Sequence, residues 1–138
     1  MQRGSESKKA LVISEGLLIY LQPEQVSDLA SALHAQPSFC AWIIDIASPQ
    51  LLKMMTRYWG KSVESGNAPF LFAPEEGTAY FERSGWREQS FRSNMDEARR
   101  LKREMKGAGF FRLFGIFYSK KTMEKWRRFA GCVLLERT

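Results

Sequence analysis

Continuous apolar stretches alternate with amphipathic segments along the first half of the chain. The first stretch, Lys9–Leu21, reads KALVISEGLLIYL and has the continuous hydrophobicity of a strand buried on both faces, ending near Ser14. Pro23 then opens an amphipathic helix that should end at or before Pro37. Its apolar positions recur at helical spacing: Val26, Leu29, Ala30 and Leu33.

The same alternation repeats in the next segment. Phe39–Ala47, FCAWIIDIA, reads as a second buried strand that carries one acid, Asp45. Ser48 and Pro49 form an N-cap and first-turn pair for a helix that Gly60 should close. Strands that alternate with helices in this way predict an α/β fold.

The second half predicts shorter elements. A loop is expected over Lys61–Phe72, and Pro74 should open a short helix with acids in its first turn, ended by Gly85. A strand follows at Trp86–Arg92, and Asn94 with Glu97 resembles a capping box for a basic helix that ends at Gly107. The final GCVLLERT reads as a short apolar strand.

The size of the chain fits one domain. Its 138 residues are 44% hydrophobic, and only the polar residues 1–8 are expected to be flexible. No apolar run reaches the roughly 20 residues of a membrane span, and no signal-peptide pattern opens the chain, so a cytoplasmic protein is expected. Cys40, Cys132 and His34 lack the spacing of a zinc site, and no metal is expected. His34, beside Leu33, is expected to be a surface or half-buried residue rather than a general base.

The charge is unevenly distributed. Residues 1–82 hold six basic and nine acidic side chains, whereas residues 83–138 hold fifteen and six, which accounts for the net charge of +6. Aromatic residues interleave with the basic ones, a combination that can bind nucleic acid or an anionic surface. Such a charge run is more often the solvated face of helices that cover a sheet, so a nucleic-acid partner is not expected. A non-enzymatic basic α/β module remains the alternative function.

No common catalytic motif is present, since the chain has no P-loop, G-x-S-x-G, H-E-x-x-H or G-x-G-x-x-G pattern. The string SEGLLIYL at the end of the first strand is the best placed for a ligand, because ligands of open α/β sheets collect at the carboxyl ends of strands. Glu15 could bind ammonium or hydroxyl groups there, and Gly16 would allow close approach of the backbone. Glu15 could equally cap the following turn and point to water.

Four segments together resemble the leucine carboxyl methyltransferases, a class I S-adenosylmethionine-dependent O-methyltransferase family. They are LVISEGLLIYL, AWIIDIAS, NAPFLFAPEEGTAYFERSGW and CVLLER, and the similarity spans about residues 9 to 138. The resemblance implies the C-terminal half of a Rossmann-like sheet with covering helices. Its strands would be the family's fourth, fifth, sixth and seventh, in the spatial order 4-5-7-6 with the last strand antiparallel. The family's glycine-rich cofactor loop has no counterpart in this chain.

The resemblance also assigns candidate residues, none of them catalytic. Glu15 matches the family acid that contacts the methionine end of the cofactor, where a carboxylate can hold the α-ammonium group, and Gly16 lies beside it. Tyr20 matches a tyrosine near the cofactor and acceptor pocket, although packing under a helix is an equal alternative. Asp45 would face the acceptor or be an exposed strand-end acid. With only these groups, the chain alone is expected to bind S-adenosylmethionine weakly or not at all.

The methyl acceptor would be a carboxylate or a small-molecule hydroxyl. The first strand would form an exposed apolar edge, which would pair with an N-terminal half domain or with a second copy of the chain. Cys40 and Cys132 both begin strands that would run antiparallel as neighbours, so the two thiols should be too far apart to form a disulfide.

Overall fold

The computed structural model describes residues 9–65, 68–101, 124 and 127–138, with only the backbone described over 59–65. The predicted flexible start, the helix end at Gly107 and most of the basic and aromatic segment lie outside these residues. The elements in chain order are β1 (Ala10–Ser14), η1 (Leu18–Tyr20), α2 (Pro23–His34), β2 (Phe39–Ala47), α3 (Pro49–Ser65), η2 (Gly77–Ser84), β3 (Trp86–Ser93), α4 (Asn94–Arg100) and β4 (Ala130–Arg137).

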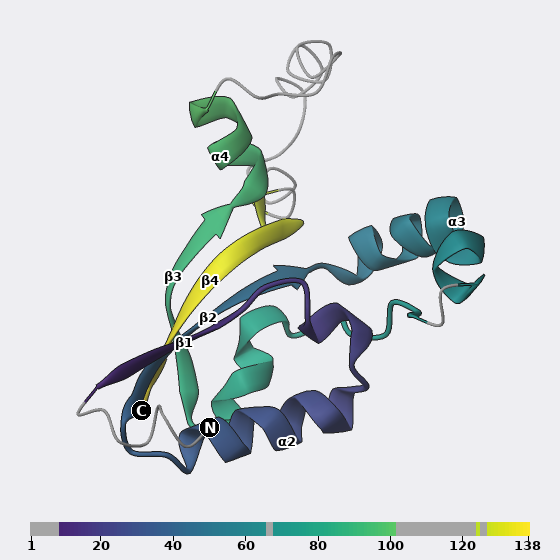
Figure 1. The fold of residues 1–138 in the computed structure, drawn as a ribbon. Coiled ribbons are helices and arrows are strands. Elements are labelled where there is room, and N and C mark those ends of the chain that lie inside the picture. The colour runs from purple at the N-terminus through teal and green to yellow at the C-terminus, as the bar shows by residue number, and fades with distance from the viewer. Residues whose placement is uncertain (1–8, 66–67, 102–123, 125–126) are drawn as a thin grey trace.

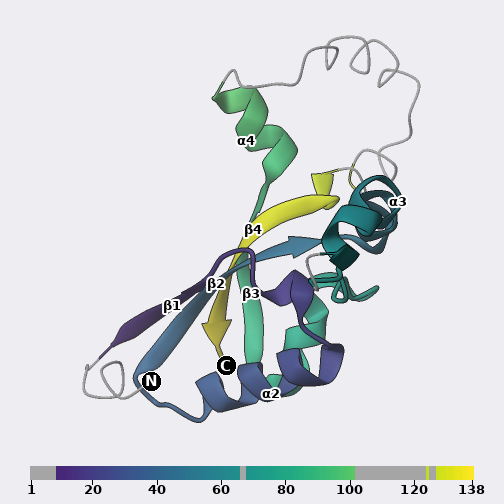
Figure 2. The same ribbon diagram turned by 45° about the vertical axis from the view of Figure 1, so that its right-hand side comes forward.

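Four strands form one open mixed sheet in the order β1-β2-β4-β3 (Figures 1 and 2). β1 pairs parallel to β2, and β4 pairs antiparallel to both β2 and β3. β1, β2 and β3 therefore run in one direction and only β4 opposes them. The α/β class is confirmed, and the strand order and the antiparallel last strand are those expected.

The strand boundaries agree with the sequence pattern to within one residue at each end. Both predicted helix starts at prolines, Pro23 and Pro49, are also confirmed. At the start of α2, Gln22 and Gln25 cap each other, since each side chain accepts a hydrogen bond from the other's backbone N–H. Proline at the first helical position removes one N–H that would lack an intrahelical partner and has a φ that already suits a helix, which favours a helix start at both prolines.

Several predicted boundaries were wrong. Gly60 does not end α3, which continues to Ser65, so the loop begins later than expected. A glycine inside a helix costs only about 1 kcal/mol relative to alanine and is therefore a weak stop signal. At the start of α4 the N-cap is Ser93, while Asn94 is the first helical residue, so the expected capping box does not form.

The short helix before Gly85 also differs from the prediction. It is a 3₁₀ helix that begins at Gly77, so Glu75 and Glu76 precede it instead of lying in its first turn. Its end agrees with the prediction, because Gly85 adopts a left-handed conformation with φ of 79°. Pro74 thus opens a turn rather than a helix.

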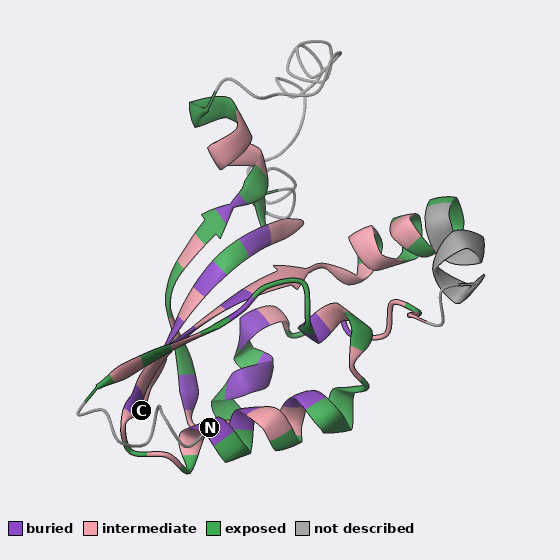
Figure 3. Cartoon of the chain, viewed as in Figure 1, coloured by how far each residue is buried: buried purple, intermediate pink, exposed green. Residues whose placement is uncertain are grey.

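The core lies on one face of the sheet, where α2 and η2 cover the strands (Figures 1 and 3). Trp42 from β2 and Trp86 from β3 are fully buried there with ring centroids 5.8 Å apart, and Phe81 from η2 meets Trp42 edge-on. Both indole N–H groups are satisfied: Trp42 Nε1 donates to Ser14 Oγ at 3.0 Å and Trp86 Nε1 donates to the Ala30 carbonyl at 2.9 Å. These bonds remove the desolvation cost of burying a tryptophan N–H.

The second face of the sheet is more open. On β1, Leu11 and Ile13 are 51% and 63% exposed, so the prediction of a strand buried on both faces is wrong for β1, because these side chains lie at the open edge of the sheet. The expected apolar edge strand is confirmed. Ile13 aligns with Ile43 of β2, and Ile43 aligns with Leu134 of β4. An apolar row therefore crosses this face from the edge toward the middle of the sheet.

The two cysteines lie far apart on neighbouring strands. Cys132 pairs with Asp45 across β2 and β4, five residues along β2 from Cys40, or roughly 16 Å of strand. Both thiols are free, as the strand order predicts.

His34 is half-buried beside Trp86, its ring edge-on at 5.8 Å, and its Nε2 is buried without a hydrogen-bond partner among the described residues. None of the helices in the described ranges is long and apolar enough to cross a membrane.

Candidate functional site at the carboxyl edge of the sheet

The carboxyl ends of three strands meet at one edge of the sheet. β1, β2 and β3 end there at Ser14, Ala47 and Ser93, and β4 begins beside them at Ala130. The loops that follow parallel strands converge at such an edge, which is where open α/β sheets bind ligands. The predicted site residues Glu15, Gly16 and Asp45 all lie at this edge.

A hydrogen bond joins the first two of these strand ends. The backbone N–H of Gly16 donates to Asp45 Oδ1 at 2.8 Å, and Gly16 has a φ of 60°, in the left-handed region that favours glycine. One oxygen of the half-buried Asp45 carboxylate therefore holds the loop after β1. Neither sequence interpretation of Asp45 included this bond.

The other two predicted residues are more exposed. The Glu15 side chain is exposed at the strand end, in position to meet a ligand or solvent. Tyr20 is 41% exposed, and its ring lies 5.7 Å from the ring of Phe70, so packing accounts for part of its surface.

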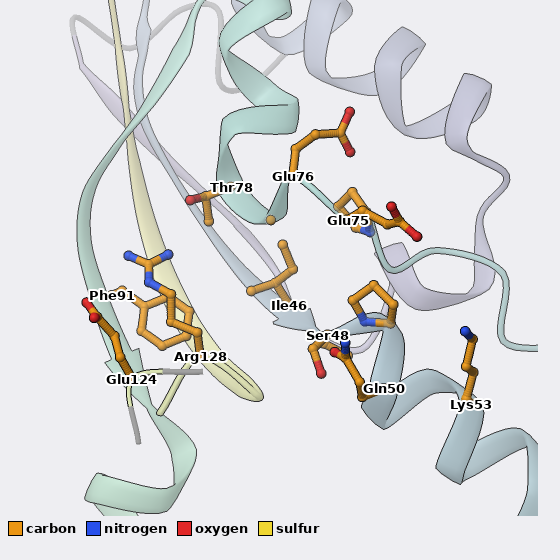
Figure 4. A pocket seen from close by; sticks show the side chains of 14 residues that line it. Ile46, Ser48, Gln50, Lys53, Glu75, Glu76, Thr78, Phe91, Glu124 and Arg128 are labelled. Carbon is orange, nitrogen blue, oxygen red and sulfur yellow. The ribbon is translucent and has the colours of Figure 1, made fainter. Parts of the chain in front are cut away.

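A cavity of about 610 Å³ opens at the same edge, on the core side of the sheet (Figure 4). The end of β2, the start of α3 and the turn before η2 form one part of its wall, and Phe91 of β3 with Glu124 and Arg128 forms another. In Figure 4, Arg128 and Glu124 lie on one side of the opening and Lys53 and Gln50 on the other. None of the four predicted site residues lines this cavity.

Hydrogen bonds to Glu88 hold Arg128 in place on its side of the cavity. The guanidinium of Arg128 donates to both carboxylate oxygens of Glu88, at 2.5 and 3.0 Å, and lies 4.6 Å from the centre of the Phe91 ring. The Thr78 hydroxyl also donates to Glu88. Such bidentate contact fixes the orientation of Arg128 at the cavity wall.

The same contacts shift two pKa values in opposite directions. The hydrogen bonds from Arg128 hold the pKa of Glu88 below its ordinary value of 4.5, against the effect of partial burial. The hydrogen bond to Glu88 raises the pKa of Arg128 above its ordinary value. Both groups therefore stay charged across the neutral range.

The opposite wall is built on the start of α3. Ser48 Oγ accepts a hydrogen bond from the Leu51 N–H at 3.2 Å, which confirms it as the N-cap, and the Ser48 N–H donates to the Phe129 carbonyl at 2.8 Å. Lys53 follows on the first turns of the helix and reaches the cavity. The wall thus brings a cation opposite Arg128, with the acids Glu75, Glu76 and Glu124 at the rim.

This arrangement can bind and orient a small polar molecule rather than attack it. The lining holds no histidine or cysteine, and the Ser48 hydroxyl already serves as a helix cap. No cluster of three His, Cys, Asp or Glu side chains able to hold a metal occurs in the described part of the chain.

Sequence reasoning missed the residues of this cavity. Thr78, Glu88 and Arg128 are brought together by the pairing of β3 with β4 and by η2 against β3, contacts between distant segments that no local motif encodes. The one usable signal was the expected strand order, which places the start of β4 beside the carboxyl ends of β2 and β3.

No family model matches the chain, and no curated protein matches it.

Proposed function

We propose that this chain forms the acceptor-side part of an S-adenosylmethionine-dependent O-methyltransferase domain. The observation that carries the proposal is the strand order β1-β2-β4-β3 with β4 alone antiparallel, which is the order that the resemblance implies. The glycine turn and exposed carboxylate at the end of β1 lie where that interpretation needs a cofactor contact.

The described residues fit only one end of the cofactor. The exposed Glu15 carboxylate would hold the α-ammonium group of the methionine moiety by charge-assisted hydrogen bonds. Gly16 has open space on its Cβ side, with no atom within 4 Å of a carbon placed there, so the backbone can be approached closely. S-adenosylmethionine would supply the methyl group on its sulfonium.

The cavity would receive the methyl acceptor. Its volume of about 610 Å³ is within the range of small-molecule sites, and Lys53 supplies a positive charge for a carboxylate, since Arg128 is already paired with Glu88. Methyl transfer to a carboxylate oxygen removes no proton from the acceptor and depends mainly on alignment of the reacting groups, so it needs no general base.

Binding of the methionine end can be tested directly. The backbone amide signals of the chain are followed by NMR during titration with S-adenosylhomocysteine. We expect a dissociation constant in the millimolar range, with the largest shifts at Glu15 and Gly16 and their loss in Glu15→Gln. Glu24→Gln, which removes an exposed carboxylate on α2, is the matched control and should bind as the wild type does.

Two results would contradict the proposal. Shifts that avoid Gly16 at saturating ligand would remove the proposed cofactor contact. Shifts that persist unchanged in Glu15→Gln would remove the role of that carboxylate. Calorimetry with micromolar one-to-one binding would instead overturn the expectation that the chain alone holds the cofactor weakly.

The alternative of a basic binding module has less support in the described residues. Several arginines there are paired with acids: Arg83 with Glu76, Arg87 with Glu136, Arg100 with Glu97, Arg127 with Asp96 and Arg128 with Glu88. Paired side chains leave less positive charge for phosphates. The chain is accordingly expected to leave a heparin column at moderate salt, whereas strongly salt-dependent retention would favour the alternative.

A further inference from the structure

The outer edge of β1 is an unprotected template for another strand. β1 lies at the end of the sheet, and no described segment pairs with its second side. Edge strands are commonly protected by proline or by charged side chains, and the sequence ALVIS has neither. Leu11 and Ile13 are instead more than half exposed.

The backbone groups of β1 are oriented for this pairing. The Ala10 N–H donates to the Ser38 carbonyl at 2.7 Å, on the β2 side of the strand. Backbone groups alternate in direction along a strand, so those of Leu11 and Ile13 point to the open edge. Two consecutive outward positions can make four hydrogen bonds to an antiparallel copy of themselves.

Charges flank the apolar positions in a self-complementary order. Exposed Lys9 precedes β1 and exposed Glu15 follows it, at equal distances from Val12. If two copies pair antiparallel about a two-fold axis at Val12, Lys9 lies opposite Glu15 of the partner copy, and Leu11 lies opposite Ile13 of the partner copy. Leu11 and Ile13 share the open face of the sheet because side chains alternate along a strand, and pairing that extends β1 by one residue at each end places Lys9 and Glu15 on the same face.

We propose that a second copy of this chain binds the β1 edge, and that the two sheets join into one through antiparallel β1–β1 pairing centred on Val12. Opposite charges at both ends and apolar pairs between them select this register over a one-residue slip, which would move the side chains to opposite faces. The assembly shares Glu15 with the proposed cofactor contact, whereas Lys9 belongs to the dimer alone, so the Lys9 variant separates failure of the dimer from failure of the cofactor contact.

The dimer should be weak. Five-residue strands bury less than the ~1,600 Å² of a standard stable interface, so the association is expected in the micromolar range. An N-terminal half domain, the other occupant expected from the sequence, is not contained in residues 1–138 and therefore cannot produce association of these purified residues.

The test uses charge exchange at the two flanking residues. Sedimentation velocity over a wide concentration range should show a monomer–dimer equilibrium for the wild-type chain. Lys9→Glu alone and Glu15→Lys alone each place like charges at both ends of the pair and should weaken the dimer roughly tenfold. An equimolar mixture of the two variants restores opposite charges at both ends and should associate as tightly as the wild type. Glu82→Lys, an exposed change on η2, is the control and should leave association unchanged.

The proposal fails if the wild-type chain stays monomeric at several hundred micromolar. It also fails if the single variants associate like the wild type, or if the mixture associates no better than either variant alone. Both charged positions are exposed, so the variants should fold, and a circular dichroism spectrum of each verifies this.

Discussion

Asp45 and Gly16, 29 residues apart, are joined by a hydrogen bond of 2.8 Å from the glycine N–H to the aspartate Oδ1. The bond connects the carboxyl end of β2 to the loop that leaves β1. It therefore fixes the path of the backbone at Gly16, and with it the position of the neighbouring Glu15 carboxylate on which the proposed cofactor contact depends.

Removing the acceptor should loosen this loop. Asp45→Ala is expected to lower the free energy of unfolding by about 1 kcal/mol, the typical value of one hydrogen bond, measured by urea denaturation. Asp45→Asn keeps a side-chain oxygen that can accept from Gly16 and should lose less. Asp28→Ala, an exposed acid on α2, is the control. A Gly16 amide resonance that is identical in Asp45→Ala and the wild type would contradict the expected role of the bond.

Two glycines with the same backbone conformation should respond differently to alanine. Gly77 and Gly85 have φ values of 62° and 79°, so a side chain at either is strained by about 1 kcal/mol. At Gly77 no atom lies within 4 Å of an added Cβ, whereas at Gly85 the added carbon would lie 2.4 Å from Nε2 of His34.

Gly85→Ala is accordingly expected to cost roughly 2 kcal/mol more in unfolding free energy than Gly77→Ala, since the half-buried imidazole must move against Trp86. The double variant Gly85→Ala/His34→Ala removes the imidazole that the added Cβ would meet. Its unfolding free energy should recover part of the extra loss seen in Gly85→Ala relative to Gly77→Ala. Equal losses at the two glycines would show that space beside His34 does not limit the turn.

The sequence pattern anticipated the strands closely because each strand is a short run with a strong signal. Phe39–Ala47 and Ala10–Ser14 are apolar and partly β-branched, and prolines or a glycine turn limit their ends. The predicted helix end at Gly60 was wrong because a glycine stops a helix only when the backbone turns left-handed there, as it does at Gly85. The presence of a glycine in the sequence does not by itself determine whether the backbone adopts that left-handed conformation.

The candidate site was only partly predictable for a different reason. The residues at the strand ends, Glu15, Gly16 and Asp45, follow from the positions of the strands. The cavity depends instead on Arg128, just before β4, meeting Glu88 in the middle of β3, 40 residues away. Pairing between distant segments is a property of the tertiary fold, so charge composition showed an excess of basic residues without showing which acids they meet.

The Glu88–Arg128 pair should make stability depend on pH in the acidic range. The pKa of Glu88 is lowered in the folded chain by Arg128, so the unfolded state takes up a proton first as the pH falls. The stabilisation is therefore complete above the ordinary pKa of 4.5 and is lost as the pH drops through the lower folded value.

Glu88→Gln removes this effect. The variant is expected to be less stable than the wild type by about 1 kcal/mol at neutral pH, a value limited by the partial exposure of both side chains. The difference should shrink on acidification below the ordinary pKa of the carboxyl, measured by thermal unfolding over a pH series. Glu82→Gln, outside the pair, is the control, and a difference that is constant over the series would argue against the ion pair as its source.

The antiparallel register of β2 and β4 predicts the behaviour of the two thiols. Cys132 is exposed and lies opposite Asp45, while Cys40 is half-buried five residues along β2 and its Sγ donates to the Ser38 carbonyl at 3.5 Å. A disulfide needs Cα atoms within about 7 Å, which this register does not allow.

Mild oxidation should therefore give no intramolecular bridge, and a maleimide should label Cys132 faster than Cys40. Peptide mapping of the labelled chain identifies each thiol, and Cys132→Ser should remove the fast phase. A chain mass lower by two hydrogens after oxidation at low protein concentration would place the cysteines side by side and contradict the sheet order.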